Sequence, residues 1–566
     1  MTSCLLSFNL LPWRGSRPLH VLKESSIRCN RLVHQYATAQ QSFEELGLRR
    51  PVIAALQEAF PNVIRPTPAQ ASFIPALLSG KDILLKGQTG SGKSFGLLLA
   101  LLSLPRKFNR VELDGKYVKS STTTSLFIVP HRDLALQLMH WTASIHASIL
   151  QTGGIDSVAQ LVLRGINPIP AQVDKIHNCS PHVLIGTPQA VLEALQLESN
   201  PLKLPHLSTI VVDEADYLIQ YTPRAPDKYK RDKFELDLKR HPSVTRQILD
   251  MVYSPMRQAF NKKKGIKQAQ EIERPLKPMV LHRPQLIMTS ATLKSQFRYS
   301  VLTEGGWFRQ ADDKVTIVTG SPSEVEDANS VMGGGSLVHS ALIVSDDGTV
   351  RNIPGAVDLP TGTAETETTQ GEADQPVATE IPPPSSEDFD DFTDTASPFN
   401  QNALEAVATV FALDVPRVAL LVLKAAAPVR RAIFDLRSLG INAHGLDVLE
   451  PQSGGSFLLQ RGVAPEDNPT LLVSTLATTR GLDLPDLTHV FLLGAPTGLT
   501  PDEYMHVAGR TGRFGKDGTV IAVLEEPRIV KDNTGKTYNQ NEPRWIQNIY
   551  TKIGVTPRMV AHFGNE

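Results

Sequence analysis

The sequence predicts an α/β protein built from two tandem parallel-sheet domains, and three observations carry this prediction. Short, almost wholly apolar runs alternate with amphipathic helical stretches from Ser42 onwards, and the alternation starts again in the second half of the chain. A glycine-rich loop also joins one apolar run directly to a helical stretch. Continuous apolar strands separated by helices indicate a parallel sheet that is covered on both faces. The expected strands are Asp82–Lys86, Ser125–Val129, Val183–Gly186, Ile210–Asp213 and Gln285–Ser290 in the first half, and Val418–Leu423, Thr470–Ser474, His489–Leu493 and Gly518–Leu524 in the second.

The chain of 566 residues is too long for one hydrophobic core, since a domain usually holds about 100–200 residues. Its 41 prolines and 38 glycines are typical of globular domains that carry low-complexity insertions. We therefore divide it into a leader at 1–39, a first α/β domain at 40–325, a second α/β domain at 326–530 and a C-terminal extension at 531–566.

The net charge of −1 conceals two oppositely charged segments. Residues 222–283 hold 16 Lys and Arg against 7 Asp and Glu, whereas residues 352–416 hold 13 acids and no Lys or Arg. We interpret 222–283 as a basic insertion in the first domain. The acidic stretch at about 355–398 is predicted to be a disordered insertion, because it cannot bury enough apolar surface to offset its ordering entropy.

The leader at 1–39 has the composition of a mitochondrial transit peptide. It contains several serines and a single acid, Glu24, beside five bases. The alternative is an ordinary disordered basic tail. We expect import into the mitochondrial matrix, with removal of the leader near Tyr36–Ala37. The bases are Arg14, Arg17, Lys23, Arg28 and Arg31.

Two further absences narrow the class of protein. The three cysteines, Cys4, Cys29 and Cys179, have no metal-ligand spacing and exclude a disulfide framework. No stretch approaches the roughly 18 consecutive apolar residues of a membrane span. A soluble protein that does not enter a membrane is therefore expected.

The first motif that carries chemistry is a phosphate-binding loop. It follows the predicted strand Asp82–Lys86 and precedes the helical run Phe95–Ser103. In such a loop the backbone N–H groups surround the β-phosphate, while Lys93 neutralises phosphate charge and the Ser94 hydroxyl binds Mg²⁺. A lone match could be a glycine-rich turn, but its position between a strand and a helix favours nucleotide binding. The loop consists of Gly87, Gln88, Thr89, Gly90, Ser91, Gly92, Lys93 and Ser94.

The second motif is the acidic sequence Asp213-Glu214-Ala215-Asp216. Three apolar residues, Ile210, Val211 and Val212, lead directly into it, which indicates the carboxyl end of a buried strand and not a solvated surface loop. At that end of a parallel sheet it would lie beside the phosphate loop. Asp213 would then hold Mg²⁺ through water, and Glu214 would orient and deprotonate the water that attacks the γ-phosphate.

With these motifs, the sequence resembles the DEAD-box RNA helicase family from about residue 43 to 525. The resemblance implies two RecA-like domains, ATP and Mg²⁺ as cofactors, and RNA as the partner. It also implies that Phe43 stacks on adenine and that Gln70, which follows Thr67-Pro68-Ala69, hydrogen-bonds the edge of the base. An amide that both donates and accepts suits adenine and not guanine.

The resemblance assigns roles to further residues in the order of the family's motifs. It implies that the segments 130–135 and 187–188 contact the RNA backbone, and that segment 290–292 links nucleotide state to closure of the two domains. In the second half, Thr475 would contact RNA, Asp483 the ATP ribose, and Arg510 and Arg513 would be arginine fingers that stabilise transition-state charge. The residues so assigned are Pro130, Arg132, Thr187, Pro188 and Thr475 for RNA, Asp216, Ser290, Thr292 and His506 for interdomain coupling, and Lys93, Asp213, Glu214, Arg510 and Arg513 for catalysis.

The sequence departs from the family's pattern at three places. Leu476 and Val507 stand where the family usually has Asp and Arg, so that both members of a polar pair are replaced together. Gln189-Ala190 replaces the usual Gly-Arg, which weakens one of the predicted contacts with the RNA backbone. The set expected to bind and split ATP remains complete.

The expected function is that of an ATP-dependent RNA helicase, a monomer whose two domains close on RNA through largely sequence-independent contacts. Within the family the leader and the two insertions most resemble a fungal mitochondrial member associated with assembly of the large mitoribosomal subunit. Ribosomal RNA and large-subunit precursors would then be the partners. Two alternatives stay open: a weakly catalytic or non-catalytic RNA-binding assembly scaffold, and a DNA translocase.

Overall fold

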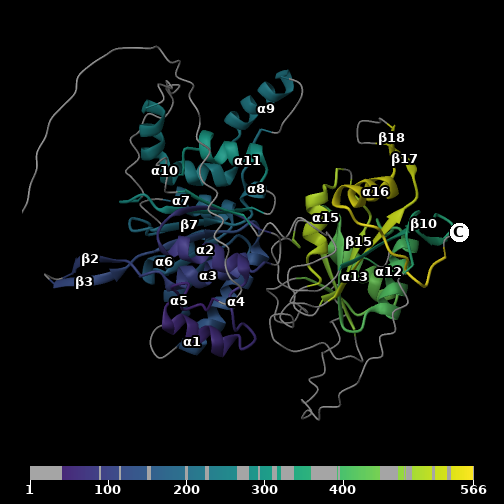
Figure 1. Cartoon of the computed structure of the whole chain (residues 1–566), viewed down its shortest axis with the longest axis horizontal. Coiled ribbons are helices and arrows are strands. Elements are labelled where there is room, and N and C mark those ends of the chain that lie inside the picture. Colours follow the sequence, from purple (N-terminus) through teal and green to yellow (C-terminus); the bar gives the residue numbers. More distant parts are fainter. Residues whose placement is uncertain are drawn as a thin grey trace, which may run out of the picture.

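The computed structural model of the chain has two lobes, each with its own sheet and core (Figure 1). The first lobe extends from the N-terminal helices to β9, and the second from β10 to the segment that follows α16. The structure describes residues 41–87, 91–113, 116–149, 154–197, 202–222, 228–263, 280–290, 293–308, 315–319, 337–358, 392, 395–446, 469–476, 478–479, 487–496, 498–512, 517–531 and 537–564.

Within the described residues, the first lobe holds a seven-stranded sheet in the order β5-β6-β4-β7-β8-β1-β9, and every pairing in it is parallel. Helices cover both faces, as expected for strands that are apolar throughout. The strands are β1 (Asp82–Lys86), β4 (Ser125–Ile128), β5 (Ala159–Val162), β6 (Val183–Gly186), β7 (Thr209–Val212), β8 (Gln285–Ser290) and β9 (Val315–Thr319), with a separate hairpin of β2 (Phe108–Leu113) and β3 (Lys116–Ser121). The helices are α1 (Arg50–Ala59), α2 (Pro68–Leu78), α3 (Lys93–Ser103), α4 (Arg132–Ile149), α5 (Ile155–Val158), α6 (Ile169–Asn178), α7 (Pro188–Gln196), α8 (Ala215–Leu218), α9 (Lys228–Arg240), α10 (Val244–Lys263), α11 (Ser295–Tyr299) and the π-helix η1 (Ser300–Glu304).

The described part of the second lobe repeats this architecture with the strand order β11-β10-β16-β15-β12-β14-β13, in which only the β10–β11 pairing is antiparallel. The predicted boundary at 325/326 falls between β9 and β10. The elements are β10 (Leu337–Val344), β11 (Val350–Asn352), β12 (Val418–Leu423), β13 (Ala443–Gly445), β14 (Thr470–Thr475), β15 (Leu487–Leu493), β16 (Gly518–Glu525), the hairpin β17 (Arg528–Lys531) and β18 (Thr537–Gln540), and the helices α12 (Gln401–Asp414), α13 (Val429–Ser438), α15 (Pro501–Ala508) and α16 (Glu542–Ile553).

The prediction of two parallel-sheet α/β domains is thus confirmed, and each of the nine expected strands is present to within two residues. They were recognisable because they are buried along their whole length, as in β4, β6, β7 and β12. Strands with a weaker pattern were missed. The missed strand β10 carries His339 and Ser340 in its middle, and both are buried in the second core.

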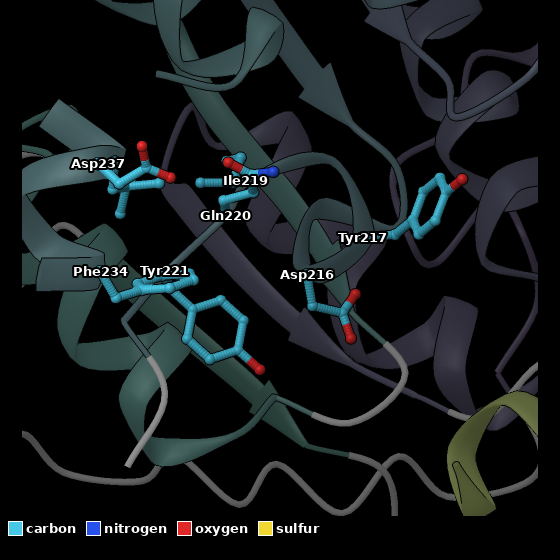
Figure 2. A pocket seen from close by; sticks show the side chains of 8 residues that line it. Asp216, Tyr217, Ile219, Gln220, Tyr221, Phe234 and Asp237 are labelled. Carbon is cyan, nitrogen blue, oxygen red and sulfur yellow. The ribbon is translucent and has the colours of Figure 1, made fainter. Parts of the chain in front are cut away.

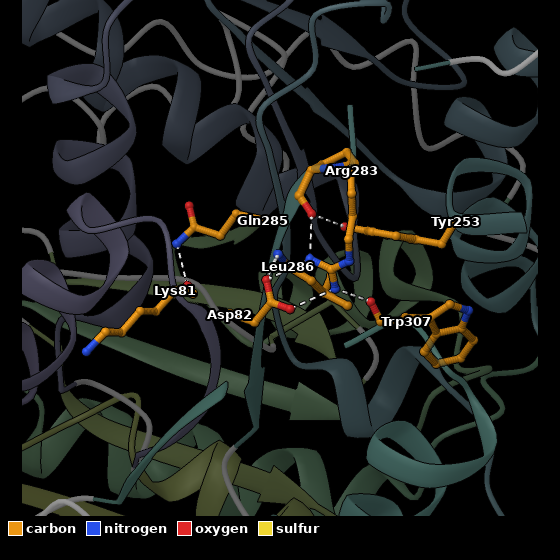
Figure 3. A network of polar contacts seen from close by, with 8 residues as sticks. Lys81, Asp82, Tyr253, Arg283, Gln285, Leu286 and Trp307 are labelled. Atoms are coloured by element: carbon orange, nitrogen blue, oxygen red, sulfur yellow. Dashed lines mark hydrogen bonds and ion pairs between the residues drawn. The ribbon is translucent and has the colours of Figure 1, made fainter. Parts of the chain in front are cut away.

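The basic insertion is fixed to the first lobe by α10 and by a buried ion pair near its end. Arg283 donates to both carboxylate oxygens of Asp82 at 3.1 and 2.7 Å, and also to the carbonyl of Trp307. Asp82 is fully buried at the start of β1, where it also accepts from the backbone N–H of Leu286 at 3.0 Å. The guanidinium lies over the ring of Tyr253 from α10, 5.3 Å from its centroid (Figure 3). The pair therefore joins the amino ends of β1 and β8 to the insertion.

The predicted C-terminal extension at 531–566 contains helix α16, which packs against the second lobe together with the segment that follows it. Helix α16 packs through Ile546, Ile549 and Tyr550 into the core beneath β16. The chain then returns along β10 and β11, where Arg558 N–H donates to the His339 carbonyl at 2.7 Å. A helix with such an apolar face has to be buried to be stable, so it belongs to the second domain.

The predicted acidic insertion at about 355–398 is described only at its two flanks. Residues 359–391 lie outside the described residues, but both flanks are fixed. Asp358 accepts from Arg558 Nη1 at 3.0 Å through its carbonyl. On the other side, Arg431 of α13 donates to the carbonyl of Phe392 at 2.9 Å and lies over its ring, 5.7 Å from the centroid. The flanks at 355–358 and 395–398 therefore lie against the second lobe, and the expected disorder between them stays a prediction.

Within the described chain, none of the helices combines the length and the apolar character needed to cross a bilayer.

Candidate nucleotide and RNA site

The phosphate loop leads from β1 into α3, as its sequence predicts. Lys93, the first residue of α3, donates through Nζ to the Gly87 carbonyl at 2.7 Å and to Ser91 Oγ at 3.4 Å. The ammonium is therefore turned back into the loop that would surround a phosphate. Gly92 has a φ of 77°, a left-handed conformation that favours glycine. Gln88, Thr89 and Gly90 lie outside the described residues.

The acidic motif lies directly beside this loop. Ser94 Oγ donates to Asp213 Oδ2 at 2.6 Å, and Thr289 Oγ1 on β8 donates to Asp213 Oδ1. The backbone N–H of Glu214 donates to Thr289 Oγ1 at 3.0 Å, and Glu214 itself has a φ of 48°. A left-handed glutamate is uncommon and redirects the chain sharply after β7. The structure thus brings together the carboxyl ends of β1, β7 and β8.

Sequence reasoning missed Thr289. Ser290 and Thr292 drew attention because they belong to the recognised motif, whereas Thr289 precedes it. Side chains alternate between the two faces of a strand, so Thr289 and Ser290 lie on opposite faces of β8. This alternation was the one signal in the sequence that Thr289 faces a different set of neighbours from Ser290. Ser290 is buried and accepts from the backbone N–H of Gly87 at 3.2 Å through its carbonyl. Thr292 lies outside the described residues.

The predicted adenine reader Gln70 is tied to the phosphate loop. Its amide Nε2 donates to the Gly92 carbonyl at 3.0 Å, and its Oε1 accepts from the Thr67 N–H at 2.9 Å. Thr67 Oγ1 in turn donates to the Ser91 carbonyl at 2.9 Å. Gln70 therefore caps α2 and holds the loop at the same time, with only 3% of its surface exposed.

Phe43, which is predicted to stack on adenine, is buried in this structure. It is 3% exposed and belongs to the same core as Leu46, Leu48 and Leu56. Both ring faces are therefore covered by protein, and stacking on adenine would need the segment at 42–48 to move. The sequence marked Phe43 as aromatic at the right distance from Gln70 but could not indicate which way the ring points.

The RNA residues predicted for the first lobe lie on neighbouring strands. Pro130 and Arg132 follow β4, and Thr187 and Pro188 follow β6, which pairs with β4 in parallel. Parallel neighbours end at one edge of the sheet, so these residues share that edge. Ala190, which stands at one of the departures from the family pattern, is fully buried in the core.

In the second lobe, Thr475 ends β14 with 8% exposure, and its Oγ1 lies 3.0 Å from Thr478 Oγ1. Helix α15 carries His506 and leads to Arg510, whose Nε donates to the His506 carbonyl at 2.9 Å. Arg510 is 1% exposed, so in this structure the predicted arginine finger is folded into its own domain and does not project into a cleft. Asp483 and Arg513 lie outside the described residues.

The paired departures Leu476 and Val507 meet in one apolar cluster. Val507 is 2% exposed within the core that includes Tyr504 and Leu492, and Leu476 packs against that core. An aspartate or arginine alone at either position would be placed in apolar surroundings without a partner. Their joint replacement is therefore compatible with a well-packed second domain.

The two lobes are linked by an ion pair between Lys294 Nζ and Asp502 Oδ2, 2.9 Å apart. Lys294 lies just after β8 and Asp502 is the second residue of α15. The hydrogen bond that Lys294 donates to Asp502 raises the pKa of Lys294, so the ammonium stays charged. Nearby, a cavity of about 250 Å³ opens between α8 and α9, lined by Asp216, Tyr221 and Phe234 among others (Figure 2).

No group of three or more His, Cys, Asp or Glu side chains suited to a metal lies among the residues that the structure describes. The Ser94–Asp213 pair supplies two oxygen donors, which is the donor type that Mg²⁺ takes from proteins while phosphates and waters complete its coordination. The pair therefore fits such an ion beside a nucleotide.

The fold and this site together define a two-domain P-loop nucleotide-binding protein. Residues 67–249 match the DEAD/DEAH box helicase family, and residues 452–515 match the helicase conserved C-terminal domain. Over these two stretches the chain is similar to DEAD-box helicases.

Individual relatives show the same similarity over part of the chain. The chain is 34% identical over 186 residues to a protein named probable ATP-dependent RNA helicase DDX28 of Mus musculus, which covers 32% of each chain. It is 35% identical to the Homo sapiens protein of that name, again over 32% of each chain. The matched region thus spans about a third of these relatives. S. cerevisiae Dbp5 bound to RNA and ADP BeF3 aligns with a TM-score of 0.52 and 16% identity, over 93% of this chain and 96% of that one, which supports the fold.

Proposed function

We propose that this chain is an RNA-stimulated ATPase that acts as an ATP-dependent RNA helicase in the mitochondrial matrix. One observation carries the proposal: the continuous hydrogen-bonded series from Ser94 through Asp213 to Thr289, which joins the phosphate loop, the acidic motif and β8. A change at the γ-phosphate would therefore alter contacts at the ends of β1, β7 and β8. Such a connection is what an enzyme needs to convert hydrolysis into movement between domains.

Each residue has a role in the proposed reaction. Lys93 and the loop N–H groups would bind the β- and γ-phosphates, and Glu214 would accept a proton from the attacking water. Ser94 and Asp213 would hold Mg²⁺, which supplies charge stabilisation on the phosphate oxygens. Arg510 and Arg513 would stabilise the transition state once the lobes close. For Arg510 this requires its release from its present burial against His506.

RNA would lie along the carboxyl edges of both sheets. Pro130, Arg132, Thr187 and Pro188 would contact it from the first lobe, and Thr475 from the second. Contacts to phosphate and 2′-OH make such binding largely independent of sequence. Closure of the lobes on a few nucleotides would bend one strand and break a short duplex locally.

The central test compares two single variants for nucleotide affinity and turnover in the presence of RNA. Glu214→Gln should keep ATP affinity and reduce hydrolysis by about 10²-fold or more, because an amide cannot act as a general base. Lys93→Ala should weaken ATP binding itself. The control is Glu405→Gln on the exposed face of α12, which should change neither. Hydrolysis by Glu214→Gln within a few-fold of the unaltered chain would contradict the assignment.

The mitochondrial part of the proposal rests on the composition of residues 1–39. A reporter joined to residues 1–40 should accumulate in the matrix. Replacing Arg14, Arg17, Arg28 and Arg31 together should leave it in the cytosol. Unchanged import of that variant would contradict the interpretation of residues 1–39 as a mitochondrial transit peptide.

The partner that we propose is ribosomal RNA in precursors of the large mitoribosomal subunit, on the family resemblance of the leader and the insertions. Crosslinking of the full chain to RNA in intact mitochondria should recover large-subunit ribosomal RNA above other transcripts. Recovery of messenger RNAs alone would contradict this partner. Competition by single-stranded DNA as strong as that by RNA would favour the DNA translocase.

A further inference from the structure

Helix α9 of the basic insertion is unusually exposed for a helix of a folded domain. It projects away from the body of the first lobe, on the side nearer the second lobe (Figure 1). Of its side chains from Arg231 to Arg240, only Leu238 is buried. A helix of this length gains little stability by itself, and most protein helices are stabilised by burying an apolar face. The surface of α9 therefore calls for an explanation other than packing.

One side of α9 combines apolar groups with positive charge. Tyr229, Lys233, Leu236 and Arg240 recur at intervals of three or four residues, so they lie along one face of the helix. Tyr229 is 75% exposed and Leu236 is 49% exposed. Large apolar side chains gathered on a surface with bases are typical of an interaction site.

The charges on α9 leave a positive excess on this face. The helix carries six Lys and Arg against three Asp and Glu, although the whole chain has a net charge of −1. Glu235 is paired with Lys239 at 2.7 Å, and Asp232 lies 3.8 Å from Arg231. Among the described residues no ion pair involves Lys233 or Arg240, so their charges are available to an external anion.

The opposite side of α9 connects it to the catalytic motif. Phe234, Asp237 and Leu238 line the cavity whose other wall includes Asp216 and Tyr221 (Figure 2). Leu238 is 6% exposed and is the point where α9 is fixed. The exposed face is therefore held at a defined place next to the acidic motif, and not on a remote appendage.

We propose that α9 is an accessory contact for single-stranded RNA that continues beyond the cleft, in which Tyr229 stacks on a base and Lys233 and Arg240 contact phosphates. Interleaved aromatic and basic side chains are the chemistry with which proteins bind single strands without sequence preference. The inference rests on the proposed function, since RNA must first occupy the cleft. It goes beyond that function because none of these residues belongs to the helicase motifs.

The test uses the full chain and two RNAs: a short strand that fills only the cleft, and the same strand extended at both ends. Tyr229→Ala should weaken binding of the extended strand by at least about fivefold, the lower range of losing one stacked base, and Tyr229→Phe should retain it. Lys233→Gln with Arg240→Gln should make the log–log salt dependence shallower by about 1.4, because each phosphate contact contributes roughly 0.7 on a single strand. The short strand should bind every variant equally well.

The matched charge control is Lys552→Gln on α16 of the second lobe, which is also exposed and should leave the salt dependence unchanged. Hydrolysis of ATP with the short strand separates this proposal from the proposed function. Normal hydrolysis with unaltered binding of the extended strand by the α9 variants would overturn the accessory contact alone. Loss of a protein partner by these variants without loss of RNA affinity would likewise overturn it. Absence of hydrolysis in the unaltered chain would instead contradict the proposed function.

Discussion

The two lobes share one strand arrangement but differ in what stands at the carboxyl edge of the sheet. In the first lobe, that edge holds hydrogen-bonded polar groups, with Asp213 joined to Ser94 and Thr289. In the second, Leu476 after β14 and Val507 on α15 pack into an apolar cluster. The same backbone framework therefore supports a polar cluster or an apolar one, according to a few side chains placed where parallel strands end.

The lobes also differ in how they hold a buried carboxylate. Asp82 in the first lobe faces Arg283, whose side chain is only 11% exposed. Glu542 in the second is equally buried, but its partner Lys424 is 42% exposed, and Gln540 also donates to it at 2.8 Å. Each carboxylate has one ionic partner and further donors, but the partner of Asp82 is mostly buried and donates to both of its oxygens, whereas the partner of Glu542 is partly exposed.

The largest effect on stability is expected when the Asp82–Arg283 pair of the first lobe is broken. Arg283→Ala leaves Asp82 buried without its charge partner, so it should lower the free energy of unfolding by about 3–5 kcal/mol. Lys424→Ala should have a smaller effect, because Glu542 keeps other donors. Urea unfolding followed by circular dichroism measures both. Equal losses of stability in the two variants would contradict the difference drawn between the two buried carboxylates. Arg164→Ala in an exposed pair is the control, with an expected loss below about 1 kcal/mol.

The next effect is a loss of folding stability at acid pH, which we expect in both lobes. Burial lowers the pKa of His182 in the first lobe and of His339 in the second to about 4. Above pH 6.5 each imidazole is neutral in both the folded and the unfolded chain. As the pH falls from about 6.5 to about 4, only the unfolded chain gains the proton, so stability is lost by up to about 3 kcal/mol for each group.

The acid effect is checked by unfolding at a series of pH values. His182→Gln and His339→Gln should each reduce the slope of stability against pH in this range. The two reductions should be similar, since the two rings are buried to a similar degree. A slope that does not change in either variant would contradict the burial of neutral imidazoles.

A smaller effect tests the apolar edge of the second lobe. Leu476→Asp and Val507→Arg should each destabilise the chain, because a lone charge enters an apolar cluster. The double variant should recover part of the loss, with a coupling energy of about 0.5–3 kcal/mol between the two new charges. Simple additivity of the two losses would indicate that these positions do not contact one another.

The smallest effect concerns the link between the lobes. Lys294→Gln or Asp502→Asn should change stability by less than about 1 kcal/mol, because the two side chains are 51% and 40% exposed. The loss should diminish further at high salt, where exposed charges are screened. A large, salt-independent loss in either variant would mean that the lobes depend on this contact to fold.

The sequence predicted most of the fold because buried parallel strands are apolar along their whole length. It also predicted that Ser94 and Asp213 meet, since both follow recognisable strands. It did not reveal Thr289, because the sequence alone does not give the neighbours of β8 in the sheet. Nor could it give the burial of Phe43 and Arg510, which depends on side-chain direction and on packing between distant segments. Helix α9 was expected only as part of a basic segment, since its apolar residues are interspersed with charged ones.

The most direct test of the account is the rate of ATP hydrolysis by the unaltered full chain, measured with and without single-stranded RNA. The polar edge of the first lobe predicts slow hydrolysis by the chain alone and a clear acceleration when RNA brings the lobes together. ATP binding without hydrolysis at any RNA concentration would contradict this account and would identify the chain as an RNA-binding scaffold.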